Sequence, residues 1–282
     1  MKIIFSRKGF DSSAGGAPSP IVDGRPISLP IPLDLKHTRY RDLRDPIPSL
    51  VNDLTRGRHT ANSYCHLDPD IDPSATRLPR PSLWRGALGQ IGAAQSHLSR
   101  QNVGPGDLFL FWGLFRHAAC KNGQWRYEGQ PMHLIFGWLE IGEVHLVGNR
   151  GANLVKRHGW LGLHPHVRPG WERWSAHERS NNTIYLASER LSVLPGLKLP
   201  GSGVLGRGHV LTSATSHLKS VWQVPEWLHP RSGGSGMSFH PPGRWLDGGE
   251  VRSAGRGQEF VADIGSATEP LRWLKTVFAK SV

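Results

Sequence analysis

The sequence predicts an α+β protein in which short β-strands outnumber helices. Twenty-two prolines and 34 glycines divide the 282 residues into short pieces, which disfavours long helices. Two near-continuous apolar runs, at 107–116 and 133–144, are rich in residues that favour buried strands. Hydrophobic residues make up 38% of the chain and eleven residues are tryptophan, so a sizeable core can form. Since no linker divides the chain, we expect one domain over residues 1–282, with long loop-rich insertions.

The first part of the chain has four expected elements. They are a strand at 2–6, a hairpin that turns at Asp23-Gly24, a short helix near 46–55 inside a loop-rich layer at 34–82, and a helix at 85–101. The longer helix is expected because Leu88, Ile91 and Leu98 could share one face.

The two apolar runs are expected to be central strands joined by a long polar loop at 117–132. Gly113 lies inside the first of these strands and Gly137 inside the second. A glycine within a strand indicates a bulge, a barrel corner or the close approach of a ligand or a backbone.

The second half of the chain is again loop-rich. Its expected elements are a strand at 183–187, a short helix at 216–228, a strand at 259–264 and a C-terminal helix at 269–280. The last helix would bury an apolar face made of Leu271, Leu274, Val277 and Phe278.

The charge of the chain favours a polyanionic partner. Its 34 Lys and Arg exceed its 22 Asp and Glu, which leaves a net charge of +12, and Arg outnumbers Lys by 25 to 9. Because a guanidinium binds phosphate with two nitrogens and stacks on bases, this bias suits DNA, RNA or a nucleotide. A GC-rich genome would also enrich Arg, Gly, Pro and Trp, and that explanation stays open.

Several classes of protein are disfavoured. Two cysteines provide neither a disulfide framework nor a four-cysteine zinc site. No apolar run is long enough to span a membrane or to serve as a signal peptide, so we expect a cytoplasmic protein without a membrane partner. The sequence has no GxSxG, HExxH or Walker motif. It therefore leaves open whether the chain is an enzyme, and it identifies no cofactor and no oligomeric state.

The N-terminal block FSRKGFDSSAGGAPSPI combines polar side chains with glycines at the end of a strand. It presents a hydroxyl, two cations and a carboxylate on Ser6, Arg7, Lys8 and Asp11. Backbone N–H groups beside Gly9 could hold a phosphate that Arg7 and Lys8 neutralise. An ordinary surface turn is the competing interpretation.

Two short segments carry residue types that bind metals. The first is CHLDPDID, with Cys65, His66, Asp68, Asp70 and Asp72. Its alternating carboxylates could bind a divalent cation, although Asp-Pro pairs also form ordinary turns, which is the interpretation we favour. The second is LHPH, where His164 and His166 would share one face of a strand. Fifteen histidines are scattered through the chain, so we assign no metal site.

Two blocks carry a resemblance to PUA-like barrels. GDLFLFWGLFR and HLIFGWLEIGEV resemble the core hairpin of that fold, including its EVE and ASCH members, over about 104–148. The resemblance implies a barrel with a pocket for RNA or a modified base. In such a pocket Trp112 or Trp138 would stack the base, while burial of both rings in the core is the alternative.

The blocks FSRKGFDSSAGGAPSPI, GDLFLFWGLFR, FGWLEIGEV and SGMSFHPPGRW together resemble the third nucleotide modification associated domain family. The resemblance implies a link to bacterial and phage DNA-modification and conflict systems. Our hypothesis is a protein that modifies a nucleobase or nucleotide, in which Ser6 and Asp11 lie nearest the reacting group. The residues that would hold nucleic acid are Arg7, Lys8, Trp112, Arg116, Trp138, His240 and Arg244. Two alternatives stay open: a non-catalytic reader of modified bases, and a metal-dependent nuclease that uses residues 66–72.

Overall fold

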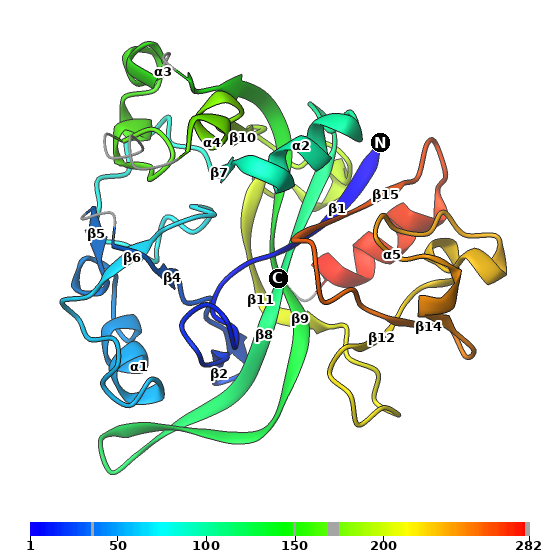
Figure 1. Ribbon diagram of the computed structural model, residues 1–282, viewed down its shortest axis with the longest axis horizontal. Helices are drawn as coiled ribbons and strands as arrows, with labels where there is room; N and C mark the ends of the chain where they lie inside the picture. The colour runs from blue at the N-terminus through cyan, green and yellow to red at the C-terminus, as the bar shows by residue number, and fades with distance from the viewer. Residues whose placement is uncertain (35–36, 149–150, 169–174, 280–282) are drawn as a thin grey trace.

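The computed structural model describes residues 1–34, 37–148, 151–168 and 175–279, and its centre is a nine-stranded mixed sheet (Figure 1). The main path of the sheet runs β15 (Glu259–Asp263), β1 (Lys2–Arg7), β8 (Leu108–Lys121), β9 (Gln124–Leu146), β10 (Thr183–Ala187) and β7 (Ala87–Gln90). Off this path lie β11 (Ser202–Val210), β2 (Ser19–Val22) and β3 (Arg25–Pro26). Strand β1 is parallel to β8, whereas β8 and β9 form an antiparallel pair.

The PUA-like barrel expected from the sequence is not confirmed. Among the described residues the sheet stays open, because its two edge strands β15 and β7 have no backbone pairing with each other. These edges nevertheless approach through their side chains, since Gln90 Nε2 donates a hydrogen bond to Glu259 Oε1. The architecture is therefore an α+β, strand-rich fold whose central sheet curls without closing.

The β8–β9 hairpin confirms the two central strands and corrects the segment between them. Residues 117–132 continue both strands, and the turn consists of Asn122 and Gly123, which both have positive φ. The polar residues of this segment are largely exposed because the hairpin extends past the core. Gly113 and Gly137 confirm the close approach of backbone, since a Cβ there would lie 2.6 Å and 2.8 Å from the carbonyl oxygens of Lys8 and Gly203.

Two expected helices are wrong in whole or in part. In the segment 85–101, only α2 (Gly92–Arg100) is helical, and the preceding residues form β7. The segment 216–228 has no α-helix: its middle forms β12 (Val221–Gln223), which pairs with β14 (Glu250–Arg252) and buries Trp222 completely, and Glu226–Leu228 form a 3-10 helix. In both places long-range strand pairing outweighs local helix propensity.

The other expected elements are confirmed. They are β1, the β2–β3 hairpin with its turn at Asp23-Gly24, α1 (Ile47–Leu54), β10, β15 and α5 (Glu269–Phe278). Of the four residues expected on the buried face of α5, Leu274, Val277 and Phe278 are fully buried. The fourth, Leu271, is partly buried and packs against the same cluster.

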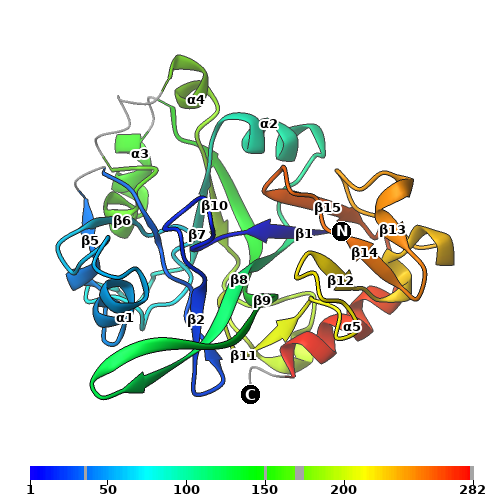
Figure 2. The same ribbon diagram turned by 60° about the horizontal axis from the view of Figure 1, so that its bottom comes forward.

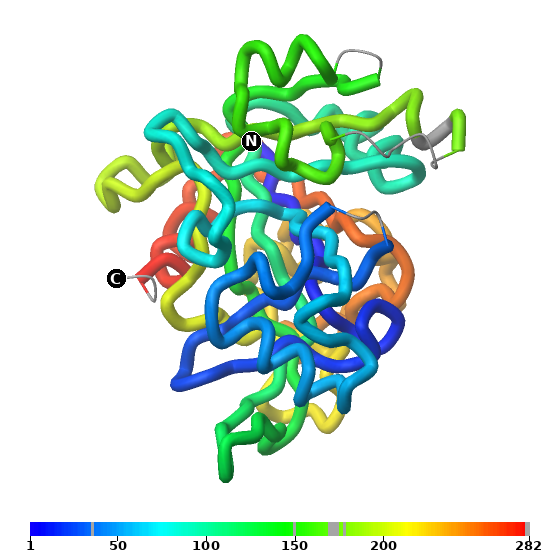
Figure 3. The backbone as a smooth tube through the Cα atoms, turned by 90° about the vertical axis from the view of Figure 1, so that its left-hand side faces the viewer, coloured from blue at the N-terminus to red at the C-terminus, as the bar shows by residue number. Residues whose placement is uncertain are grey.

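Two outer layers flank the central sheet. The N-terminal layer contains α1 and a small sheet of β4 (Ile31–Pro32), β5 (Thr38–Arg39) and β6 (Tyr64–His66), and it occupies the side that faces the viewer in Figure 3. The C-terminal layer contains α5 and a sheet of β12, β13 (Trp245–Leu246) and β14, and it lies on the opposite side of the β8–β9 hairpin (Figure 2). The remaining α-helices are α3 (Gly151–Arg157) and α4 (Ala176–Ser180).

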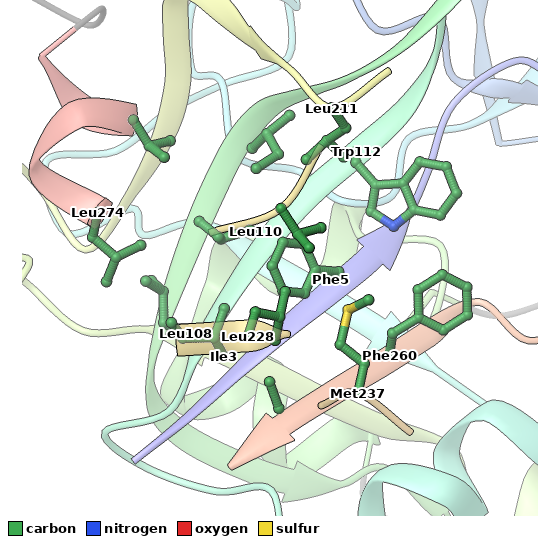
Figure 4. Packing of buried hydrophobic residues seen from close by; sticks show 14 of the residues in the cluster. Ile3, Phe5, Leu108, Leu110, Trp112, Leu211, Leu228, Met237, Phe260 and Leu274 are labelled. Atoms are coloured by element: carbon green, nitrogen blue, oxygen red, sulfur yellow. The ribbon is translucent and has the colours of Figure 1, made fainter. Parts of the chain in front are cut away.

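The two faces of the central strands pack into different clusters. Alternate residues such as Ile3, Phe5, Leu110 and Trp112 pack against the C-terminal layer, as Figure 4 shows. Their neighbours Ile4, Phe109, Phe111 and Val261 face the opposite side. Within the described part of the chain, no helix is long and apolar enough to cross a membrane.

Candidate functional site

Strand β1 brings two polar side chains to the face of the sheet that it shares with Ile4. Ser6 and Lys8 follow Ile4 at intervals of two residues, and β15 pairs with β1 so that Glu259 lies opposite Ser6. Lys8 Nζ donates to Glu259 Oε1 at 3.1 Å, and this pair is almost completely buried. Gln90, at the end of β7, donates to the same carboxylate oxygen. The two edges of the curled sheet thus meet at one buried ion pair.

Two polar atoms of this group lack hydrogen bonds within the described residues. Both Ser6 Oγ and Glu259 Oε2 are buried without a partner there. Leaving such atoms unsatisfied costs free energy, so their presence needs an explanation beyond folding. Both atoms are suited to hydrogen bonding with a ligand that reaches this position.

A second buried group surrounds the carboxylate of Asp68, which follows β6 in the N-terminal layer. The backbone N–H of Gly89 in β7 donates to Asp68 Oδ1 at 2.7 Å, and His164 Nε2 lies 3.3 Å from the same oxygen. The other oxygen, Oδ2, lies 3.8 Å from His66 Nε2 and 3.9 Å from His166 Nε2. Three imidazoles therefore converge on one carboxylate.

Asn182, just before β10, orients His166. Asn182 Nδ2 donates to the backbone oxygen of His166 at 2.8 Å, and this bond directs Asn182 Oδ1 to His166 Nδ1 at 2.9 Å. The Nδ1 atom is therefore the protonated one, and Nε2 carries a lone pair on the side of Asp68.

Burial controls the ionisation of these side chains. It lowers the pKa of His66 to about 3, with the nearby His166 adding to the effect, and it lowers the pKa of His166 to about 4. Burial alone would raise the pKa of Asp68, but the surrounding histidines outweigh it and hold that pKa well below its usual range. At neutral pH the group therefore consists of an ionised carboxylate and neutral imidazoles at His66 and His166.

Strand β7 connects the two buried groups. Gly89 donates to Asp68, and the next residue, Gln90, donates to Glu259. The charge of Lys8 adds a small contribution to the lowered pKa of His66 and of His166, after that of burial. A Cβ on Gly89 would overlap the ring of His166, which explains why glycine occupies this position in the strand.

A cleft of about 460 Å³ opens between the N-terminal layer and the central sheet. Asp68 and Asp70 lie on its wall, and so does Gly9, two residues after the end of β1. Its other walls are largely apolar and include Ile27, Leu67, Ile71, Trp125, Phe136 and Val204. A cleft of this size and composition accepts a ligand as large as a nucleotide.

The structure brings Ser6 and Lys8 to this site but places Asp11 elsewhere. Asp11 lies in a turn, where its Oδ1 accepts hydrogen bonds from Ser13 and from the N–H of Ala14. Burial raises the pKa of Asp11, but these bonds outweigh it and the pKa is below its usual value. The carboxylate is thus engaged in forming the turn. Arg7 is the last residue of β1 and follows Ser6 directly, so it points to the other face of the sheet.

The aromatic candidates are core residues in this structure. Trp112 is 1% exposed and packs edge-to-face against Trp222 at 4.6 Å, while Trp138 is 3% exposed and contacts Phe278. Neither ring has a free face for a base.

The remaining candidates are spread over distant elements. Arg116 lies on the β8–β9 hairpin, where its Nε donates to the carbonyl of Gly129 at 2.8 Å. His240 and Arg244 belong to the C-terminal layer, where His240 is buried and Arg244 donates to backbone oxygens at 3.3 Å. No contact described for Arg116 or Arg244 connects them to the cleft.

Sequence reasoning missed that two separate motifs form one group. CHLDPDID and LHPH are about 100 residues apart in the sequence, and His164 and His166 would share one face only if they lay in a strand. They lie instead in the turn after a 3-10 helix at Gly159–Leu163. Glu259, Gln90 and Asn182 were not singled out. Glu259 could have been found because it directly precedes the apolar run 260–262 of a strand.

A comparison with models of known protein families identifies the family of this chain. The model of the family described as nucleotide modification associated domain 3 matches residues 2–263. The chain belongs to this family. No curated protein and no solved structure matches it. The match confirms the association with nucleotide modification that the sequence blocks indicated, and it includes every residue of the two buried groups.

Proposed function

We propose that this family member binds a nucleobase or nucleotide, most simply one presented by DNA, in the cleft at Asp68 and modifies it there. The observation that carries the proposal is the concentration of buried ionisable groups at one position: Asp68 with its histidines, and the Lys8–Glu259 pair beside them. Burying such groups costs free energy, and apolar side chains at the same positions would stabilise the fold without that cost. Ionisable groups with shifted pKa values gather at reaction sites. The association of the family with nucleotide modification supports a nucleobase or nucleotide as the substrate.

The lining of the cleft favours the base and sugar over a row of phosphates. It carries Arg25 and Arg44 against five aspartates, so its own charge disfavours a polyanion. Its apolar walls suit the planar face of a base, which in DNA would have to leave the helix to reach Asp68. The net charge of +12 would then act on the phosphates from outside the cleft.

The buried groups divide the chemistry between them. The ionised Asp68 and the neutral imidazoles next to it are suited to hydrogen-bond the base and to stabilise positive charge that develops on it. The Lys8 ammonium is suited to stabilise negative charge that develops on the substrate, and the unsatisfied Ser6 Oγ and Glu259 Oε2 are suited to orient it.

The test is a comparison of Asp68→Asn with Asp247→Asn. Asp247 lies in the C-terminal layer and its side chain is 96% exposed, so it is a matched control for the loss of one carboxylate. We expect incubation of the protein with DNA or nucleotides, together with the extract of a host cell, to yield nucleosides of altered mass. Asp68→Asn should reduce their yield by ~100-fold or more, and Asp247→Asn should leave it unchanged.

The same experiment separates the alternatives. Shortened strands without new nucleosides would identify a nuclease. Salt-sensitive binding without any chemical change would identify a reader of modified bases. Equal activity in both variants would reject Asp68 as the reacting position.

A further inference from the structure

The two oxygens of Asp68 have different surroundings. Oδ1 faces donors: the N–H of Gly89 at 2.7 Å, and His164 Nε2 at 3.3 Å. His164 Nδ1 accepts a hydrogen bond from the backbone N–H of His166, so its Nε2 is the protonated nitrogen. Oδ1 is therefore held in place by the N–H of Gly89, with the Nε2 of His164 beside it.

Oδ2, by contrast, lies near the Nε2 atoms of two histidines and beyond hydrogen-bonding distance of both. The nearest atoms from the histidines are His66 Nε2 at 3.8 Å and His166 Nε2 at 3.9 Å. Because the hydrogen bond with Asn182 Oδ1 puts the proton of His166 on Nδ1, the Nε2 atom carries a lone pair. This lone pair lies on the side of Asp68 Oδ2. His66 adds a ring whose Nδ1 is buried without a hydrogen-bond partner among the described residues. Electron pairs that converge in a buried space call for a cation between them.

We propose that His66 Nε2, Asp68 Oδ2 and His166 Nε2 together bind one divalent transition-metal ion. One ligand atom from each of these residues lies within 4.8 Å of the other two. Each atom has to move by only a few tenths of an ångström to reach the roughly 2.0–2.2 Å of a metal–ligand bond. The proposal concerns binding of the ion and holds whether or not the protein modifies nucleotides.

The ligand set selects the class of metal. Two imidazoles and one carboxylate suit Zn²⁺, Fe²⁺ or Co²⁺, whereas Ca²⁺ and Mg²⁺ prefer oxygen ligands. Three protein ligands leave coordination positions for water or substrate. Gly89, His164 and Asn182 hold the ligands from outside, which is the arrangement that orients first ligands in metalloproteins. Lys8 lies near the site, but Glu259 balances its charge.

A second group of similar composition lies at the end of β9 and provides the control. Glu143, His145 and His158 also bring ligand atoms within 4.8 Å of one another. There, however, Arg85 donates to Glu143 Oε1 and His145 Nε2 lies 2.9 Å from Oε2, so both carboxylate oxygens already have partners. The Glu143 side chain is also 35% exposed, which weakens its hold on an ion.

The experiment measures metal binding directly. Protein treated with a chelator is dialysed against Zn²⁺, and the bound ion is counted by mass spectrometry. A titration with Co²⁺, followed by its visible absorption, reports on the ligands. We expect one tightly bound ion per chain, and a higher melting temperature with Zn²⁺ than without it. Asp68→Asn and His66→Gln should each weaken binding by ~100-fold or more, which exceeds the loss typical of a supporting residue.

Two further variants test the details. Asn182→Leu leaves all three ligands in place, and we expect it to weaken binding by ~10- to 100-fold. His145→Gln should leave both the stoichiometry and the affinity unchanged.

Three results would overturn the proposal. The first is no retained ion in the wild-type chain. The second is unchanged affinity in Asp68→Asn or His66→Gln; if Asp68→Asn fails to fold, the His66→Gln protein decides. The third is loss of the ion in His145→Gln alone, which would assign the metal to the group at the end of β9.

Discussion

The two faces of strand β1 differ in polarity: one lies against an apolar cluster and the other leads to buried polar groups. On one face, Ile3 and Phe5 lie in an apolar cluster with Trp112 and the helix α5. On the other, Ile4 is followed by Ser6 and Lys8, which lie among buried polar groups. Since adjacent residues of a strand point to opposite faces, seven residues at the N-terminus supply both the core and the candidate site.

The difference separates stability from function. The apolar face contributes the free energy of burial, which is largest for its aromatic rings. The polar face buries Lys8, Glu259 and Asp68, whose desolvation offsets much of what their contacts contribute. We therefore expect substitutions on the first face to unfold the protein, and substitutions on the second to remove its activity or its ion at less cost in stability.

The largest expected effect is on the apolar face. Trp112→Ala should lower the free energy of unfolding by about 3–5 kcal/mol, because it removes a fully buried ring packed against Trp222. Urea denaturation measures this loss. Trp125→Ala, on a half-buried ring of the hairpin, should cost clearly less. A loss below about 1 kcal/mol for Trp112→Ala would contradict the tight packing of this ring in the core.

The second prediction concerns the buried ion pair on the polar face. Lys8→Met should destabilise the protein by about 3 kcal/mol, because it leaves the carboxylate of Glu259 buried and uncompensated. Adding Glu259→Gln should restore most of this loss, since the uncompensated charge is then gone.

Thermal unfolding of the wild type, both single variants and the double variant measures the coupling between the two residues. The double variant should remain inactive in the nucleoside assay. A double variant that is stable and fully active would exclude this pair from the site.

A smaller effect is expected at Gly89, between the two buried groups. Gly89→Ala should cost about 1–3 kcal/mol, because the added methyl group overlaps His166 and one of the two must move. It should also weaken metal binding, and this part distinguishes the site from the apolar core. Gly104→Ala serves as the control, since no atom lies within 4 Å of its Cβ. If Gly89→Ala retained the wild-type affinity for Zn²⁺, His166 would not be a ligand.

The smallest effect is a pH dependence that arises in the C-terminal layer. Burial lowers the pKa of His240 to about 4 from its ordinary value of 6.5. Its neutral ring donates from Nδ1 to the carbonyl of Ser238 and accepts at Nε2 from the N–H of Ala254, and a proton on Nε2 would break the second bond.

The unfolded chain therefore binds more protons than the folded chain between pH 6.5 and 4, and stability falls as the pH is lowered through this range. His240→Gln should reduce the loss between pH 7.5 and 5.5 by roughly 1 kcal/mol. Unfolding curves at the two pH values measure it. An unchanged difference between them would mean that His240 does not titrate with folding.

Local patterns were sufficient for much of the fold. The runs at 2–6, 183–187 and 259–264 form strands as expected, because a short apolar stretch of β-branched and aromatic residues has few other stable states. The helix at the C-terminus was equally predictable, since its apolar residues repeat at helical spacing. The sequence indicated members of the candidate site, Ser6 and Lys8 in one block and the CHLDPDID and LHPH residues in two others, but not that these blocks meet.

Other features depended on distant partners. Residues 85–90 were expected to be helical, yet pairing with β10 makes Ala87–Gln90 the strand β7, in which the N–H of Gly89 donates to Asp68. The polar alternation at 117–132 has no apolar face to identify it as a strand until β8 and β9 pair along their whole length.

What the sequence determined by itself is the central strands, the C-terminal helix, the family and the residue types available for chemistry. Only the tertiary structure decided that His66 and Asp68 meet His164 and His166, and that Lys8 and Gln90 of β7 both donate to Glu259 of β15. The physical reason is range. Periodicity records which side of its own element a residue faces, whereas the meeting of side chains about 100 residues apart depends on how the whole sheet curls and packs.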